Sequence, residues 1–100
     1  MSIISSNIKE IEKLCLENRV KFLYAFGSVL SDSFDNNSDV DLLVDFDTIA
    51  ISEYADNYYN LKFGLQKLFN REVDLLEQKA LKNPYFTAHI NQQKTLIYEH

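Results

Sequence analysis

Two aspartates separated by one residue head an apolar run, and this pattern constrains the fold more than any other part of the chain. Asp39 and Asp41 lead directly into the apolar residues 42–44, and Gly27-Ser28 precedes them with ten residues between. In a β-strand, residues at i and i+2 point to the same face, about 6–7 Å apart. Carboxylates held this close repel each other unless a cation lies between them. The pattern therefore predicts a strand that carries a hard divalent cation such as Mg²⁺.

The composition is that of an ordinary folded protein. Of the 100 residues, 46% are hydrophobic and 25% are charged, with one Pro and two Gly, so we predict one domain over residues 1–100. No apolar run approaches the ~18–20 residues of a membrane span, and the N-terminus lacks a signal-peptide pattern. A single cysteine, Cys15, excludes an intramolecular disulfide and fits a reducing compartment. We expect a cytoplasmic protein with no membrane partner.

The charge pattern argues against a general nucleic-acid binder. The net charge is −5, and Lys and Arg are scattered singly, whereas such a binder needs clustered basic residues to displace counterions. The acidic residues instead concentrate in one segment without any Lys or Arg: Asp32, Asp35, Asp39, Asp41, Asp45 and Asp47. Such a cluster is tolerated if it is solvated or if part of it binds cations.

Hydrophobic periodicity predicts alternating helices and strands. Apolar residues at helical spacing predict a helix that Ser5 or Ser6 caps and that ends near Asn18, and a longer one from Ile51 to Leu68. β-branched and aromatic runs predict strands. The predicted strands span 20–26, 40–46 and 71–77, a short helix opens at Ser28, and a short apolar piece covers 96–98. This order predicts an α/β (α+β) fold with a small mixed three- to four-stranded sheet and helices packed on it.

Asn83 and Pro84 mark the start of the last predicted helix. Asn is a favourable N-cap, and Pro is favourable at the first helical position. The spacing predicts that this helix turns Phe86, His89 and Ile90 inward.

A third acidic residue, Asp74, lies within the apolar segment 72–76. If Val73 and Leu75 face the core, Asp74 faces the opposite side of its strand. A role as a third cation ligand would explain why a lone Asp lies between apolar residues of a strand.

The Gly27-Ser28 turn complements the carboxylates. Because Gly has no Cβ, backbone N–H groups at this turn can approach a phosphate closely. Phosphoryl transfer from a nucleoside triphosphate uses two metal ions about 3.5–4 Å apart that clamp the attacking and leaving oxygens. A phosphate-binding turn followed by three carboxylates predicts this chemistry.

Each of these residues also has a plainer interpretation. Asp39 and Asp41 could form a solvated turn that enters a strand, and Asp74 could be a solubilising charge on an edge strand. Gly27-Ser28 could simply end a strand. The spacing between the Gly-Ser pair and the two aspartates, together with Asp74, favours the metal site.

The same residues resemble a known signature. Gly27-Ser28, the ten-residue gap and the segment 38–44 are similar to the motif of the DNA polymerase β nucleotidyltransferase superfamily. The small size resembles its minimal nucleotidyltransferase (MNT) branch, Asp74 matches the family's third carboxylate, and Asn83-Pro84 fits the branch's C-terminal tail. The resemblance spans about residues 20–98.

The resemblance implies a short mixed sheet with helices on one side and an enzymatic role. Asp39, Asp41 and Asp74 would be the catalytic residues that hold two Mg²⁺ ions, and Gly27 with Ser28 would bind the triphosphate of ATP. Many members of the branch are antitoxins encoded beside a HEPN-domain toxin, and some transfer AMP from ATP to the toxin. The implied activity is Mg²⁺-dependent transfer of AMP to a protein hydroxyl, with a HEPN toxin as partner and the oligomeric state left open.

The positions directly after Gly27-Ser28 depart from the family pattern. The family usually carries basic residues and a Gly there, roughly Gly-Ser-Arg-x-Arg-Gly, whereas residues 29–32 are Val-Leu-Ser-Asp. Each charge-assisted bond is worth roughly 1.5–3 kcal/mol, so their loss weakens triphosphate binding. Lys62, Lys67 and Arg71 are the basic residues that could compensate. The alternative function is therefore a catalytically inactive antitoxin that acts by protein–protein binding only.

Overall fold

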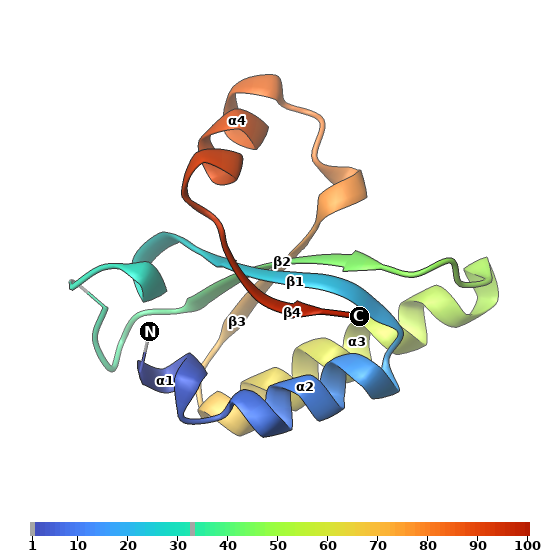
Figure 1. The fold of residues 1–100 in the computed structure, drawn as a ribbon, viewed down its shortest axis with the longest axis horizontal. Coiled ribbons are helices and arrows are strands. Elements are labelled where there is room, and N and C mark those ends of the chain that lie inside the picture. The colour runs from blue at the N-terminus through green and yellow to red at the C-terminus, as the bar shows by residue number, and fades with distance from the viewer. Residues whose placement is uncertain (1, 33) are drawn as a thin grey trace.

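The predicted mixed α/β architecture is confirmed by the computed structural model, which describes residues 2–32 and 34–100 (Figure 1). The strands are β1 (Val20–Phe26), β2 (Val40–Phe46), β3 (Val73–Glu77) and β4 (Thr95–Glu99). The helices are α1 (Ser2–Ser5), α2 (Ile8–Glu17), α3 (Ile51–Phe69) and α4 (Pro84–Gln93). Two short 3-10 helices are η1 (Gly27–Leu30) and η2 (Gln78–Ala80).

The strands of the described chain form one four-stranded mixed sheet in the order β3-β2-β1-β4. β1 runs antiparallel to both β2 and β4, whereas β2 and β3 are parallel. A parallel pair requires a crossover of a dozen or more residues, and the 19 residues of α3 lie in that connection. The sequence predicted β1, β2 and α3, and β3 except that the strand begins at Val73 instead of Arg71, whereas the short apolar piece at 96–98 lies within β4. The long crossover explains why α3 lies between β2 and β3.

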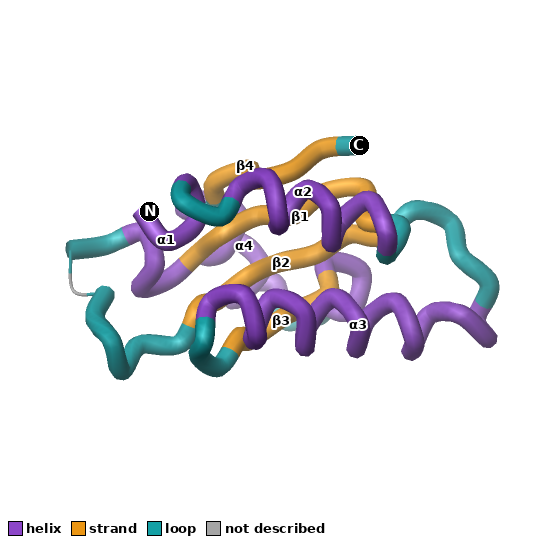
Figure 2. Tube along the Cα trace, turned by 90° about the horizontal axis from the view of Figure 1, so that it is seen from below, coloured by secondary structure: helices purple, strands orange, loops and turns teal. Residues whose placement is uncertain are grey.

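The main hydrophobic core lies between one face of the sheet and the helices α2 and α3 (Figure 2). Along β2, the alternate residues Val40, Leu42 and Val44 point into this core, as expected for a strand. From α3, Leu61 and Leu65 are fully buried against them. The predicted apolar stripe of α3 is therefore the surface that fixes this helix on the sheet.

The helix α4 lies on the opposite side of the sheet from α2 and α3 (Figures 1 and 2). Phe26, Leu43 and Ile90 form a small second cluster there. The expectation that helices occupy one side of the sheet is wrong for this helix.

The start of α4 confirms the predicted cap but not the predicted inward residues. The Asn83 side chain accepts hydrogen bonds from the backbone N–H groups of Tyr85 and Phe86, at 2.9 and 3.2 Å. Ile90 is buried as predicted, whereas Phe86 is 44% exposed and His89 is exposed. The first turn of α4 stands away from the sheet (Figure 1), so helical spacing alone does not bury Phe86.

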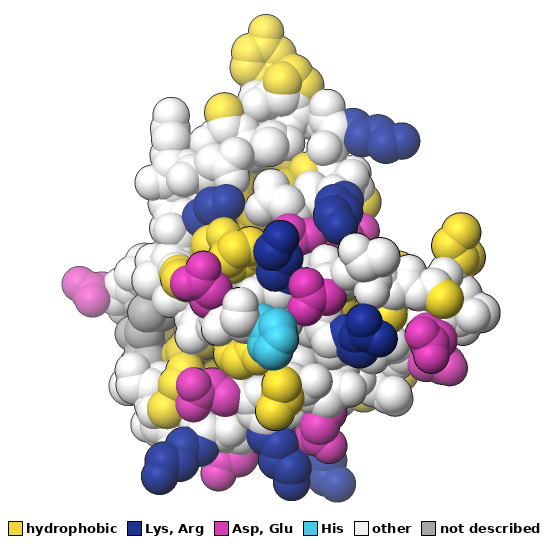
Figure 3. Space-filling model, turned by 45° about the vertical axis from the view of Figure 1, so that its right-hand side comes forward, with side chains coloured by type: hydrophobic (Ala, Val, Ile, Leu, Met, Phe, Trp, Pro, Cys, Tyr) yellow, Lys and Arg dark blue, Asp and Glu magenta, His cyan; other side chains and the backbone are white. Residues whose placement is uncertain are grey.

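Hydrophobic side chains also gather at the tip that α4 forms (Figure 3). Tyr85 is 86% exposed beside Phe86. On the face in this view, Lys and Arg side chains are interspersed with Asp and Glu.

The N-terminal segment differs from the single predicted helix. α1 ends at Ser5 and α2 begins at Ile8, with Asn7 at its N-cap position. Neither Ser5 nor Ser6 caps α2. The Asn7 side chain instead donates to the carbonyl of Ile3 at 2.8 Å, which ties the end of α1 to the start of α2. Cys15 is fully buried in the main core.

No helix within residues 2–32 and 34–100 is long and apolar enough to cross a membrane.

We predict that Asn83→Ala lowers the free energy of unfolding by about 1 kcal/mol, because two N–H groups of α4 lose their acceptor. Urea unfolding and hydrogen exchange of the α4 amides measure this change. Asn91→Ala is the matched control, since Asn91 is exposed on the same helix and Ala has the higher helix propensity. Equal stability of the two variants would contradict a role for the cap.

Candidate functional site

The parallel pairing of β2 and β3 brings two acidic residues side by side. Asp41 and Asp74 are register partners in this pair, and adjacent strands lie about 4.8 Å apart. Val73 and Leu75 point into the main core, so Asp74 lies on the opposite face, as predicted from the sequence. Asp41 shares that face with Leu43, which belongs to the second cluster. The two carboxylates therefore project from the face on which α4 lies.

Asp39 lies directly before β2, and its carboxylate is exposed. The Asp39 carboxylate also acts on Asp41. Burial raises the pKa of Asp41, and the negative charges of Asp74 and Asp39 raise that pKa further. Like charges raise a carboxyl pKa only when they are near. The three predicted acids therefore form one electrostatically coupled group.

Gly27 lies against the carboxylate of Asp41. Its φ of +75° is in the left-handed region that favours glycine. A Cβ on Gly27 would lie 2.5 Å from Oδ2 of Asp41, closer than real Cβ contacts come. The glycine is therefore required both by the backbone conformation and by the space that the Asp41 carboxylate occupies.

Ser28 follows in η1, the four-residue 3-10 helix where a short helix was predicted. Its hydroxyl donates a hydrogen bond to the backbone carbonyl of Asp39 at 3.4 Å. The β1–η1 junction thus contacts the acidic group at two points, through Gly27 beside Asp41 and through Ser28 beside Asp39.

The positions after Ser28 do not supply a cation. Val29 is buried in the main core, and Leu30 packs against it. Lys62 and Lys67 belong to α3, which covers the face of the sheet opposite α4 (Figure 2). Arg71 donates from Nη1 to the carbonyls of Asp35 and Ser38, at 2.8 and 2.9 Å. Lys62 and Lys67 therefore belong to the helix on the other side of the sheet from the carboxylates, and Nη1 of Arg71 is engaged by backbone carbonyls. Compensation by these residues stays a prediction.

The oxygen donors of this group fit Mg²⁺ that arrives with a phosphate ligand. Among residues 2–32 and 34–100, no group of three or more His, Cys, Asp or Glu side chains is arranged to hold a metal ion by itself. Magnesium commonly uses one or two protein carboxylates, with waters and substrate phosphates completing its octahedron. Neighbouring carboxylates on two strands, with a third beside them, meet that requirement.

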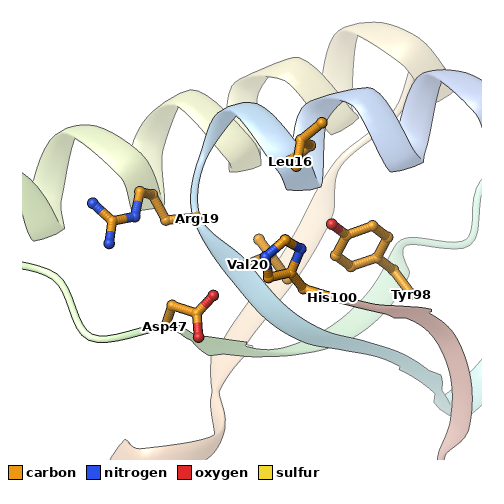
Figure 4. A pocket seen from close by; sticks show the side chains of 6 residues that line it. All are labelled: Leu16, Arg19, Val20, Asp47, Tyr98 and His100. Carbon is orange, nitrogen blue, oxygen red and sulfur yellow. The ribbon is translucent and has the colours of Figure 1, made fainter.

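A cavity lies at the far end of the sheet from the acidic group (Figure 4). Its volume is about 90 Å³. It lies where β1 begins and β2 ends, whereas Asp41 pairs with Phe26 at the other end of β1. The lining residues are Leu16, Arg19, Val20, Asp47, Tyr98 and His100. This cavity is therefore not part of the carboxylate group.

Sequence comparison identifies relatives along almost the whole chain. The family model described as "Polymerase beta, Nucleotidyltransferase" matches residues 9–100. The chain is 34% identical over 98 residues to "Putative protein adenylyltransferase MJ1379" of Methanocaldococcus jannaschii. That alignment covers 93% of this chain and 95% of the relative.

Solved structures share the fold. A chain from a toxin-antitoxin crystal structure with AMP-PNP superimposes with a TM-score of 0.71 at 23% identity, covering 94% of this chain and 74% of that chain. A chain from a tri-AMPylated Shewanella oneidensis HEPN toxin in complex with MNT antitoxin gives a TM-score of 0.65 at 21% identity. This second match covers 97% of this chain and 73% of that chain.

We predict that Gly27→Ala destabilises the protein by about 1–2 kcal/mol, the usual cost of placing an L side chain in the left-handed region. It should also displace the Asp41 carboxylate, because the added methyl group occupies its position. Chemical denaturation measures the first effect, and the chemical shifts of the Asp41 side chain report the second. In the control Gly64→Ala, the added methyl meets only the flexible end of Leu14, so Asp41 should keep its shifts.

We predict that Asp41→Asn raises the melting temperature of the metal-free protein at pH 7. The pKa of Asp41 is raised in the folded state, so its stabilising contribution is present at low pH and is lost as the pH rises through the folded pKa. The ionised side chain therefore destabilises the fold at neutral pH.

The advantage of Asp41→Asn should shrink below about pH 4, where the carboxyl is protonated in the unfolded chain too. Thermal unfolding in EDTA from pH 3 to pH 7 measures this dependence. Asp56→Asn, at an exposed position of α3, is the control. An equal gain from Asp41→Asn at both ends of the pH range would contradict the assignment.

Proposed function

The chain belongs to the polymerase β nucleotidyltransferase family, and we propose that it transfers AMP from ATP to a hydroxyl group of a protein. The observation that carries this proposal is the register of β2 and β3, which sets Asp41 beside Asp74 on the face of the sheet opposite the main core. The relative's name, protein adenylyltransferase, supports both the nucleotide and the class of acceptor. The structural neighbour with AMP-PNP supports an ATP-like substrate.

In the proposed reaction, the acceptor hydroxyl oxygen forms a bond to the α-phosphorus of ATP. The bond between the α-phosphorus and the oxygen that bridges to the β-phosphorus breaks, and pyrophosphate leaves with that electron pair. Two Mg²⁺ ions, when bound, would neutralise the phosphates and the developing charge. Asp39 and Asp41 would hold both ions, and Asp74 would complete one coordination shell.

The remaining site residues have distinct proposed roles. Asp74 accepts the proton of the attacking hydroxyl, since a carboxylate within hydrogen-bond reach can act as a general base. Gly27 and Ser28 bind the triphosphate through backbone N–H groups of the β1–η1 junction, beside the Asp41 carboxylate that Gly27 contacts. The exposed Asp39 carboxylate leaves this side of the site accessible to a large acceptor.

We further propose that the acceptor is a HEPN-domain toxin and that this chain is its antitoxin. The structural neighbour described as MNT antitoxin is in complex with a tri-AMPylated HEPN toxin, and its fold resembles this chain over 97% of the length. The same proposal leads us to expect that the two proteins meet in the cytoplasm.

We predict that Asp39→Ala and Asp41→Ala each abolish incorporation of labelled AMP from ATP into the purified partner, because the metal ions that neutralise the phosphates lose a carboxylate ligand. Labelling with α-³²P-ATP and Mg²⁺ measures the transfer. Asp45→Ala is the matched control: Asp45 lies further along β2 and pairs with Lys79 at 3.6 Å, so labelling should persist. Full labelling of the partner by the Asp39→Ala or the Asp41→Ala variant would contradict the proposed mechanism.

The second candidate is an antitoxin that neutralises its toxin by binding alone. The observation that favours it is the burial of Val29 and the inward packing of Leu30, which leave no basic side chain directly after Ser28. The labelling variants separate the two candidates, because a binding-only antitoxin still neutralises the toxin when Asp39 is replaced by Ala. Loss of neutralisation by Asp39→Ala with toxin binding retained decides in favour of the enzyme.

A further inference from the structure

Arg71 reaches across from the connection between α3 and β3 to the loop that precedes Asp39. Its Nη1 donates to the carbonyl of Asp35 at 2.8 Å and to that of Ser38 at 2.9 Å. Its guanidinium carbon lies 4.6 Å from the centroid of the Phe34 ring, a cation–π distance. One side chain therefore holds the loop at three residues, and the last of them, Ser38, directly precedes Asp39.

The turn that Arg71 holds is also closed by its own hydrogen bonds. The backbone N–H of Ser38 donates to the carbonyl of Asp35 at 3.1 Å. The Asp35 carboxylate accepts from the N–H of Asn37 at 2.8 Å and from the Ser38 hydroxyl at 3.2 Å. Arg71 therefore binds both ends of a turn with a fixed internal geometry, rather than a single point of a loose loop.

Asp39 is consequently fixed on both sides along the backbone. Arg71 binds the carbonyl before it, the Ser28 hydroxyl donates to its own carbonyl at 3.4 Å, and the N–H of Val40 donates to the carbonyl of Glu72 at 3.1 Å. The Asp39 side chain itself is exposed. Its direction is thus set by the backbone on which it stands, and Arg71 supplies the anchor on the N-terminal side.

We propose that Arg71 is a positioning residue that holds the Asp39 carboxylate in place for divalent cation and nucleotide. This inference rests on the proposed function. It assigns the arginine to the carboxylate side of the site, because the contacts of Nη1 are to backbone carbonyls. Groups that orient a metal ligand typically change metal affinity by about 10–100-fold when they are replaced.

A purely electrostatic role for Arg71 makes the opposite prediction for cation affinity. If Arg71 acted only through its positive charge, its removal would strengthen the attraction of the carboxylates for a divalent cation. A positioning role predicts weaker cation binding after removal. The sign of the change therefore distinguishes the two roles.

The test measures Mn²⁺ binding by electron paramagnetic resonance, with the full chain and a non-hydrolysable ATP analogue. We expect Arg71→Met and Arg71→Lys to raise the Mn²⁺ dissociation constant about tenfold or more. Lysine keeps the charge but lacks the planar guanidinium that lies over the Phe34 ring while Nη1 reaches both carbonyls. Arg19→Met is the matched control, since Arg19 also donates to a loop carbonyl, that of Thr48 at 3.0 Å, beyond the other end of β2. It should bind Mn²⁺ like the unmodified chain.

A double variant locates the effect. If Arg71 acts through Asp39, adding Arg71→Met to Asp39→Ala should cause no further loss of Mn²⁺ affinity, because interacting residues are not additive. In the AMP-transfer assay, Arg71→Met should lower kcat and leave KM for the acceptor protein unchanged. Circular dichroism checks the fold, and Arg71→Lys supplies the comparison should Arg71→Met not fold.

The outcomes separate this inference from the function on which it rests. Mn²⁺ binding by the unmodified chain, with unchanged or tighter binding by both Arg71 variants, overturns the positioning role alone. Absence of Mn²⁺ binding and AMP transfer in the unmodified chain overturns the proposed function and this inference with it. An additive loss in the double variant likewise overturns the coupling between Arg71 and Asp39.

Discussion

The parallel pairing of β2 with β3 is the constraint on which the rest of the site depends. Residues in register on neighbouring strands share a face, so Asp74 can lie beside Asp41 only if this register is kept. A slip by one residue would turn Asp74 toward the main core. The register is fixed by Val73 and Leu75 in that core and by α3, whose Leu61 and Leu65 pack on the sheet. Packing on the core face of the sheet therefore fixes the positions of the carboxylates on the other face.

Holding these carboxylates together lowers the stability of the metal-free protein. Burial and the neighbouring acids raise the pKa of Asp41, so its ionised form is disfavoured in the fold. Arg71, two residues before β3, donates from Nη1 to backbone carbonyls rather than to a carboxylate. The like charges therefore persist until a cation binds. Proteins commonly retain such unfavourable groups where function needs them, and the well-packed core offsets the cost.

Local patterns in the sequence predicted the features that neighbouring residues determine, namely strands, helices and a helix cap. A run of β-branched and aromatic residues identified β2, helical spacing identified α3, and the cap at Asn83 was identified from residue type. The face of Asp74 also followed from Val73 and Leu75. Features that depend on tertiary contacts could not be read in this way. Phe86 has the spacing of a buried residue but lies where α4 extends away from the sheet, and Arg71 gains its loop contacts only because β3 begins beside β2.

The departure after Ser28 links nucleotide binding to metal binding. Val29 is buried in the core and Leu30 packs against it, so the η1 segment has apolar side chains where a guanidinium would neutralise phosphate. A triphosphate carries about four negative charges, and it would approach a group of acids whose own charges raise the pKa of Asp41. In the proposed enzyme, divalent cations must then supply most of the neutralisation. Linkage makes this dependence mutual, because the factor by which cation strengthens nucleotide binding equals the factor by which nucleotide strengthens cation binding. A site of this kind assembles when both arrive, which is consistent with acids that form no complete metal cage by themselves.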